Sequence, residues 1–283
     1  MDFSIIQHIA DDIKTITIQG ATNIAKAACE VMQNELKRQT FASHEEMVDF
    51  VKKASQMLIE ARETEPLLRN GMKYAKSKLN QGADQAEIAD AFQEYLWRIE
   101  REDAVRPAIG AALIQDGDNI VTHCHSGSVV SLLATARNDH KKIHVYNTET
   151  RPLYQGRKTS VELMKAGVPD TMITDSMAPF FVDNNYENHV QIDRVFIGCD
   201  CIRLTGDVMN KVGSFAIALS ADESDMPFYV VGSLLKIDMT STIGIETRSG
   251  TELRPEAPAG LVVLNYAFDL VPAKYITGVI TEF

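Results

Sequence analysis

The sequence predicts an α/β protein with an N-terminal helical domain, residues 1–110, followed by a Rossmann-like parallel-sheet domain, residues 111–283. The first hundred or so residues contain only helical patterns. From about residue 118 onward, short apolar runs alternate with longer helix-like segments. Such alternation is typical of βαβ units in a parallel sheet. This change of pattern places the domain boundary near residue 110.

The helices of the first domain are predicted from apolar residues at helical spacing. Ser43 stands ahead of Glu45 and Glu46, which is typical of a helix start. The last helix either ends near residue 100 or continues past Pro107 as a kinked or broken helix. The four expected helices cover residues 21–37, 46–62, 66–79 and 84–100.

Five short apolar runs are expected to form the strands of the sheet, with helices at 129–137 and 214–220 among the segments that connect them. Parallel strands align their carboxyl ends at one edge, and open α/β sheets bind ligands there. Side chains that follow these runs are therefore candidates for a common site. The runs cover residues 120–122, 143–147, 171–174, 194–197 and 227–231.

Composition argues against several classes of function. The net charge of −11 disfavours non-specific binding to nucleic acid or to an anionic membrane, because both need a basic surface. A small anionic ligand is still compatible, since salt screens distant surface charge. No apolar run approaches the roughly 20 residues of a membrane span, and no signal-peptide pattern is present. The 4 cysteines are too few to indicate a disulfide framework in a chain of this length. A reducing compartment, the cytoplasm, is therefore the expected location.

The first candidate site is the segment 119–128, where an apolar run ends at Cys124 between two histidines. Ser126 or Ser128 can cap the helix that follows and leave backbone N–H groups suited to an anion. A thiol and an anion cradle at one strand end suggest an active site. His123 and His125 are more simply explained as core or surface histidines than as catalytic groups.

A second apolar run, 194–197, leads into Gly198 and then Asp200. Parallel strands would bring Asp200 and Cys124 into one crevice, where they could act as a proton-transfer pair. The alternative is a buried thiol packed as a small hydrophobe and an Asp that caps the next turn. Cys199 and Cys201 are interpreted as packing residues, because a zinc site would normally need a second, matching cysteine pair. No metal is predicted.

Two further loops carry cations and hydrogen-bonding groups. Arg151 precedes a proline, which favours an extended backbone, and its guanidinium suits a bidentate contact to phosphate or carboxylate. Asn210 and Lys211 precede a helix of small residues, and an amide and an ammonium at a helix start suit an anion. The alternative for each loop is that its charged side chains simply face solvent and bind no ligand. Lys236 is either another cation of the site or a solvated side chain.

The motifs together resemble the family that unites the initiation factor 2B regulatory subunits, methylthioribose-1-phosphate isomerase and archaeal ribose-1,5-bisphosphate isomerase. The resemblance covers nearly the whole chain, because two N-terminal segments also look like the phosphate-site segments of the family. The motifs are Ile18-Gln19-Gly20-Ala21, Ala61-Arg62…Glu65-Pro66, His123-Cys124-His125-Ser126, Thr148-Glu149-Thr150-Arg151-Pro152…Gln155-Gly156, Gly198-Cys199-Asp200 and Gly206…Asn210-Lys211-Val212-Gly213.

The resemblance implies a catalytic pair and a set of substrate contacts. The pair is Cys124, which the initiation-factor subunits generally lack, and Asp200.

The His-Cys-His-Ser form looks most like ribose-1,5-bisphosphate isomerase, whereas segments 230–238 and 245–248 look more like the methylthioribose branch. Gln19 stands where the family commonly has an Arg. Thr205 and Cys199 replace a usual Asn and a usual Ala. The implied substrate-binding residues are Gly20, Ala21, Arg62, Arg151, Gln155, Asn210 and Lys211.

The implied reaction is the aldose-to-ketose isomerisation of a pentose 1-phosphate, most simply ribose 1,5-bisphosphate to ribulose 1,5-bisphosphate. In this scheme a protonated Asp200 donates to the ring oxygen, and Cys124 either assists proton transfer between C2 and C1 or shapes a dry pocket for a hydride shift. No cofactor is needed. The alternatives are methylthioribose-1-phosphate isomerase and a non-catalytic regulatory subunit. The resemblance also implies a homodimer or larger homo-oligomer.

Overall fold

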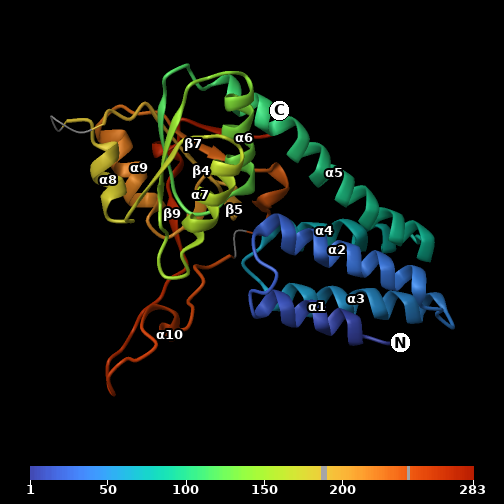
Figure 1. Ribbon diagram of the computed structural model, residues 1–283. Coiled ribbons are helices and arrows are strands. Elements are labelled where there is room, and N and C mark those ends of the chain that lie inside the picture. Colours follow the sequence, from blue (N-terminus) through green and yellow to red (C-terminus); the bar gives the residue numbers. More distant parts are fainter. Residues whose placement is uncertain (186–189, 241–242) are drawn as a thin grey trace. The chain divides into compact units, whose positions relative to one another are not determined.

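The computed structural model describes residues 1–185, 190–240 and 243–283 (Figure 1). The chain forms two units, Met1–Glu102 with Leu235–Ile237, and Asp103–Leu234 with Asp238–Phe283. The long helix α5 (Gln85–Ala112) contributes residues to both and passes through Pro107 without a break. The boundary that the sequence places at residue 110 lies inside this helix and stays a prediction.

The first unit is helical, and its helices pack their apolar faces into one core. Ser43 caps α3 as the sequence predicts, because its hydroxyl accepts a hydrogen bond from the Glu46 N–H at 3.1 Å. The amino-terminal helix α1 was not predicted, yet Ile6 and Ile13 are fully buried in the core. Besides the first part of α5, the helices are α1 (Ser4–Lys14), α2 (Ala21–Arg38), α3 (His44–Ala61) and α4 (Pro66–Leu79).

The second unit contains a parallel sheet of 6 strands in the order β10-β7-β4-β1-β2-β3. This is the strand order of a doubly wound fold, and the order reverses between β1 and β4. The predicted α/β class is confirmed, and all five predicted strands are present within a residue or so of their expected bounds. The strands are β1 (Asn119–Thr122), β2 (His144–Thr148), β3 (Asp170–Ile173), β4 (Arg194–Ile197), β7 (Phe228–Val231) and β10 (Gly278–Ile280).

Helices cover both faces of this sheet (Figure 1). The helices that connect β1 to β2 and β2 to β3 pack together, and two further helices pack together on the other side. Right-handed crossovers produce this arrangement. The core beneath α6 includes Leu132, Val145 and Phe196, all fully buried. The helices are α6 (Gly127–Asn138), α7 (Gln155–Lys165), α8 (Met177–Val182) and α9 (Ser214–Glu223).

A second sheet has the order β8-β5-β6-β9, and its β5–β6 and β6–β9 pairs are antiparallel. It was not predicted. Its strands and the remaining short elements are β5 (Cys201–Arg203), β6 (Val208–Lys211), β8 (Ile237–Asp238), β9 (Phe268–Val271), η1 (Leu234–Lys236), α10 (Gly250–Leu253) and η2 (Ala273–Tyr275). Among the helices of the described residues, none has the length and apolar character needed to cross a membrane.

Candidate functional site

Cys124 and Asp200 follow the two strands between which the strand order reverses. β1 and β4 pair in parallel with Val121 opposite Val195. Cys124 lies three residues beyond Val121, and the loop that carries Asp200 begins three residues beyond Val195. Both residues therefore stand at the carboxyl edge of the sheet, at the switch point where doubly wound folds bind ligands.

The start of α6 adjoins the loop that follows β4. Ser126 is the cap of α6, since its hydroxyl accepts a hydrogen bond from the Val129 N–H at 3.4 Å. Ser128, the other cap that the sequence offers, instead accepts from Arg106 Nη1 at 3.1 Å. A Cβ on Gly198 would lie 2.7 Å from the Ser126 side chain, so only glycine fits this close approach.

Hydrogen bonds on both sides fix the backbone of Cys124. Its N–H donates to Thr150 Oγ1 at 3.1 Å, and its carbonyl accepts from Thr159 Oγ1 at 2.9 Å. Cys124 has a φ of 68°, which is rare for a residue other than glycine. Such conformations cost free energy and persist where the surroundings hold them, as they often do at functional sites.

Burial raises the pKa of Cys124 to about 11, and the nearby carboxylates of Asp200 and Asp175 add to this rise. The ammonium of Lys211 acts in the opposite direction. At neutral pH the group is therefore a thiol rather than a thiolate. These charges act on the sulfur because they lie close to it, so the two predicted catalytic residues and Lys211 form one electrostatic cluster.

Lys211 is a buried cation that lies near carboxylates, since its charge contributes to lowering the pKa of Glu252, but it forms no ion pair with a described residue. The residue is 8% exposed, and its Nζ lies 5.1 Å from the centroid of the Phe268 ring. Within residues 1–185, 190–240 and 243–283, the Lys211 ammonium makes no hydrogen bond and no ion pair. An unpaired buried charge is costly, so this position suits an anionic group of a ligand.

Asn210 has a structural role next to Lys211. Its amide nitrogen donates to Ser214 Oγ at 2.8 Å, and that hydroxyl donates to the Lys211 carbonyl at 2.7 Å. The amide therefore fixes the turn from β6 into α9. The amide oxygen and the second amide hydrogen are left for contact with a ligand.

The start of α9, where the sequence predicts an anion, is occupied by a carboxylate of the chain itself. Asp269 Oδ2 accepts from the N–H groups of Gly213 at 2.7 Å and Phe215 at 3.1 Å. Burial raises the pKa of Asp269, while these two hydrogen bonds lower it. A ligand phosphate would therefore contact the Lys211 ammonium and not these two backbone groups.

The Arg151 guanidinium is held by neighbouring groups. Nη1 donates to the Tyr154 hydroxyl, and Nη2 donates to the Leu253 carbonyl at 3.3 Å. The Arg151 N–H donates to Asp175 at 2.6 Å, and the bond to Pro152 is cis. The two side-chain hydrogen bonds hold the guanidinium in place, and it forms no ion pair with the residues that the structure describes.

Gln155 is the first residue of α7 and carries a buried acceptor. Its Oε1 is buried and accepts no hydrogen bond from any residue in the described part of the chain. A ligand hydroxyl would satisfy this oxygen.

Lys236, which the sequence offers as a further cation of the site, is a buried residue of segment 235–237, and this segment belongs to the helical unit.

Three predicted phosphate contacts lie in the helical unit. Gly20 is the cap of α2 with a φ of 87°, and Ala21 is the buried first residue of that helix. Arg62 follows α3, and its Nε lies 3.7 Å from Glu65 Oε1. This cation therefore forms an ion pair with a carboxylate, which Lys211 does not do with any described residue.

Asp175 was missed by the sequence analysis. It accepts hydrogen bonds from the backbone N–H groups of Thr150 at 2.7 Å and Arg151 at 2.6 Å, and it raises the pKa of Cys124. Asp175 follows β3, as Asp200 follows β4. The rule that selected Asp200, a carboxylate just after a strand, would have selected Asp175 as well.

The remaining cysteines and His125 have packing or hydrogen-bonding roles. A Cβ on Gly232 would lie 2.1 Å from the Cys199 sulfur, so Cys199 packs against that glycine. Burial raises the pKa of Cys201 to about 12. His125 Nδ1 lies 3.1 Å from Thr159 Oγ1. Among the described residues, no group of three or more His, Cys, Asp or Glu side chains is arranged to hold a metal ion.

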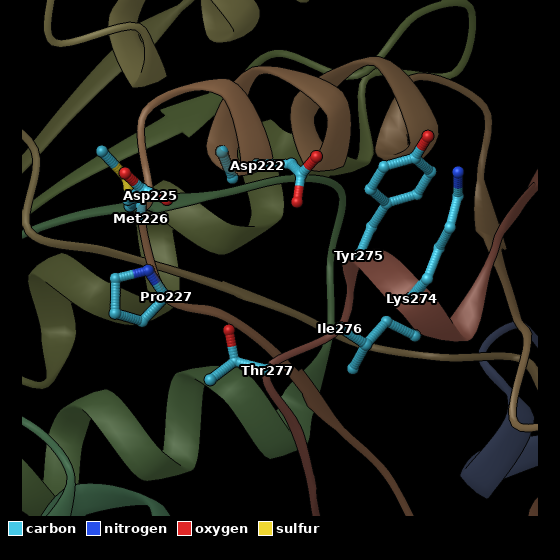
Figure 2. Close-up of a pocket in the computed structure, with 9 residues that line it drawn as sticks. Asp222, Asp225, Met226, Pro227, Lys274, Tyr275, Ile276 and Thr277 are labelled. Carbon is cyan, nitrogen blue, oxygen red and sulfur yellow. The ribbon is translucent and has the colours of Figure 1, made fainter.

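A separate cavity of about 290 Å³ lies elsewhere in the sheet unit (Figure 2). Pro227 and Thr277 line it, and each directly precedes a strand of the parallel sheet, β7 or β10. It therefore lies at the amino edge of the sheet, opposite the edge that carries Cys124. It is not part of the candidate site.

The fold and the site together define a class of protein. Its chain has a helical unit and a doubly wound sheet unit. The site at the switch point of the sheet contains a thiol (Cys124), carboxylates and the Lys211 ammonium. The chain belongs to the initiation factor 2 subunit family, whose family model matches residues 17–283. The family and the fold class that the motifs predict are thereby confirmed.

Relatives within the family carry different names. The chain is 33% identical to ribose 1,5-bisphosphate isomerase of Methanocaldococcus jannaschii, over 99% of the chain and 91% of the relative. It is 32% identical to methylthioribose-1-phosphate isomerase of Geotalea uraniireducens, over 99% and 87%. The crystal structure of translation initiation factor eIF-2B from Pyrococcus horikoshii OT3 superposes with a TM-score of 0.84 at 25% identity, covering 98% of this chain and 94% of that one.

Proposed function

We propose that this protein is an aldose–ketose isomerase acting on a pentose 1-phosphate, with ribose 1,5-bisphosphate to ribulose 1,5-bisphosphate as the leading reaction. The observation that carries the proposal is the unpaired, buried ammonium of Lys211 within the electrostatic cluster of Cys124 and Asp200. An anionic substrate would pair with this ammonium directly. The relatives named as sugar-phosphate isomerases support the same reaction class.

In this proposal Asp200 and Cys124 divide the chemistry. In its protonated form Asp200 donates a proton to the ring oxygen, which opens the ring and leaves the Asp200 carboxylate. A hydride then moves from C2 to C1, and the C2 hydroxyl returns a proton to the Asp200 carboxylate, so protons and electrons balance. Cys124 lines the reacting carbons. Its pKa of about 11 makes it a poor base at neutral pH, which favours the hydride shift over proton abstraction by a thiolate.

The substrate contacts are assigned by their chemistry. Lys211 and Arg151 suit phosphate oxygens, and the unsatisfied Gln155 Oε1 suits a sugar hydroxyl. Arg62 and the Gly20-Ala21 turn are assigned to phosphate by the resemblance, and Asn210 contributes through its amide oxygen. Precise orientation of the sugar by such contacts supplies much of the rate of an enzyme of this kind.

Methylthioribose 1-phosphate is the second candidate substrate. It carries one phosphate fewer, which fits the presence of Gln19 where the family commonly has an Arg. The proposed location is the cytoplasm, in keeping with four cysteines that form no disulfide. We also propose a homo-oligomer of at least two chains.

A turnover assay tests the function and the catalytic pair together. Ribose 1,5-bisphosphate and methylthioribose 1-phosphate are offered in parallel to wild type, Cys124→Ser, Asp200→Asn and the control Cys29→Ser, whose cysteine lies in the helical core. We expect Asp200→Asn to lose at least ~10²-fold in kcat on the preferred substrate, the low end for acid–base groups. Cys124→Ser should lose about 10²-fold, because a small misplacement of the reacting carbons has an effect of that size. The control should retain activity.

The outcomes separate the candidates. Wild type that turns over neither sugar phosphate would overturn the isomerase and favour the regulatory subunit. Activity retained in both site variants would overturn the roles of Cys124 and Asp200. The same reaction run in D₂O distinguishes the two routes, because a hydride shift brings no solvent deuterium to C1 and proton transfer does.

A further inference from the structure

His123, one residue before Cys124, connects two separate elements of the sheet unit. Its ring is buried, with Nε2 at 2.9 Å from the Val212 carbonyl and Nδ1 at 2.7 Å from Thr148 Oγ1. A carbonyl oxygen only accepts hydrogen bonds, so Nε2 carries the proton. Burial lowers the pKa of His123, so the ring is neutral and Nδ1 accepts a hydrogen bond from the Thr148 hydroxyl.

This assignment fixes the direction of a longer chain of hydrogen bonds. Thr148 Oγ1 lies 3.0 Å from Thr150 Oγ1, and Thr150 Oγ1 accepts from the Cys124 N–H at 3.1 Å. Since the Thr148 proton points to His123, Thr148 Oγ1 accepts from Thr150, whose single hydroxyl proton is shared between this oxygen at 3.0 Å and the Thr148 carbonyl at 3.3 Å. The chain therefore runs from the Cys124 N–H through Thr150, Thr148 and His123 to the Val212 carbonyl.

The same imidazole packs against the turn that follows Lys211. A Cβ on Gly213 would lie 3.1 Å from His123 Nε2, and Gly213 has a φ of 110°. A side chain at residue 213 would be strained and would press on the ring. The ring thus holds the turn both by its hydrogen bond to Val212 and by its contact with Gly213.

We propose that His123 is a positioning residue for the isomerisation: as a neutral imidazole protonated on Nε2, it holds the Lys211 turn and the left-handed backbone of Cys124 in one fixed arrangement. The proposal rests on the proposed function, because Lys211 and Cys124 are the groups that are positioned. His123 itself acts through these groups and need not touch the substrate.

The charges around His123 bear on its protonation state. The Asp175 carboxylate favours a charged ring, whereas burial and the Lys211 ammonium favour the neutral one. A second proton on Nδ1 would remove the acceptor of the Thr148 hydroxyl and reverse the chain of hydrogen bonds. The order of hydrogen bonds from Thr150 through Thr148 to His123 therefore belongs to the neutral ring.

Three substitutions dissect the two hydrogen bonds of the ring. In His123→Gln, the amide nitrogen can still donate to Val212, and in His123→Asn, the amide oxygen can still accept from Thr148. His123→Leu removes both. The matched control is His144→Leu, which removes another His–Thr hydrogen bond, 2.8 Å long and solvent-exposed, between β2 and β3.

We expect His123→Leu to lower kcat/KM by about 10²-fold, the effect of a small misplacement of reacting groups, with a rise in KM because Lys211 is displaced. The Gln and Asn variants should each recover part of the loss, and His144→Leu should behave as wild type. If His123→Leu does not fold, comparison of kcat/KM in His123→Gln and His123→Asn with that of wild type still tests the proposal. Unchanged kcat/KM and KM in the Gln and Asn variants would overturn the proposal while the isomerase assignment stands.

A second measurement does not depend on activity. The nitrogen-15 NMR signals of the His123 ring, assigned by their loss in His123→Gln, should show a neutral ring protonated on Nε2 at neutral pH. A ring protonated on Nδ1, or a charged ring, would overturn the proposed order of hydrogen bonds. If wild type turns over neither sugar phosphate, the proposed function fails, and this measurement still tests the hydrogen bonds of His123.

Discussion

The Cys124 thiol makes the stability of the protein depend on pH in the alkaline range. The pKa of Cys124 is about 11 in the folded protein and 9.0 for an ordinary cysteine. Below pH 9 the thiol is protonated in both states, and its full contribution to stability is present. Between pH 9 and 11 only the unfolded state loses the proton, so the contribution is lost as the pH rises.

We therefore expect the unfolding free energy of wild type to fall relative to that of Cys124→Ser above pH 9. The difference should be on the order of 1 kcal/mol at pH 10 compared with pH 8. Urea unfolding of both proteins at pH 8, 9 and 10 measures it, and the other cysteines cancel because both proteins contain them. Two parallel stability curves would contradict the raised pKa of Cys124.

Individual residues of the candidate site were predictable when they obeyed the strand-end rule. Cys124, Arg151 and Asp200 each follow a predicted strand, and the structure places each at the carboxyl edge of the sheet. The position of a polar residue in the sequence does not reveal its partners. Asp269, more than fifty residues away from the start of α9, accepts hydrogen bonds there, and no local pattern indicates this contact.

At the scale of elements, the sequence predicted long amphipathic helices and buried parallel strands well, because both leave a periodic or continuous apolar signal. The antiparallel sheet was missed, since β5, β6 and β9 do not show the alternation of apolar runs with helices that marks the parallel strands. The strand β10 was missed at the carboxyl end for the same reason. Pairing with distant strands stabilises such elements more than their own sequence does.

The contact between α6 and the loop after β4 gives a prediction at this scale. Gly198→Ala would place a Cβ 2.7 Å from the Ser126 side chain, and we expect it to destabilise the fold by about 1–3 kcal/mol and to lower activity. Ser126→Gly alone should cost only a few tenths of a kcal/mol (~0.3), because glycine is tolerated at a helix cap. Urea unfolding and turnover of each variant measure these effects.

The double variant tests the mechanism. Ser126→Gly removes the atoms that the new Cβ would meet, so in the background of Gly198→Ala it should restore most of the lost stability. The effects of the two substitutions would then be strongly non-additive, as expected for residues in contact. Additive effects would mean that the loop after β4 does not depend on this contact.

At the scale of the whole molecule, each unit has its own core, and the sheet unit carries a segment with little core of its own. This segment, residues 254–266 after α10, extends away from the two sheets (Figure 1). Several of its apolar side chains are exposed, with Val262 at 81% and Leu264 at 63%. Grouped apolar residues on a surface are typical of an association site. A second copy of the chain is the partner that the proposed homo-oligomer provides.

We expect the protein in solution to have at least twice the 31.4 kDa mass of one chain. Burial of the apolar segment supplies the driving force, so the double substitution Val262→Glu and Leu264→Glu should shift the population towards the monomer. Ile5→Glu, which changes an exposed apolar residue of α1 in the helical unit, is the control. Light scattering coupled to size-exclusion chromatography measures the mass. A wild-type monomer at micromolar concentration would exclude the homo-oligomer, whereas a double variant that stays associated would place the contact on another surface.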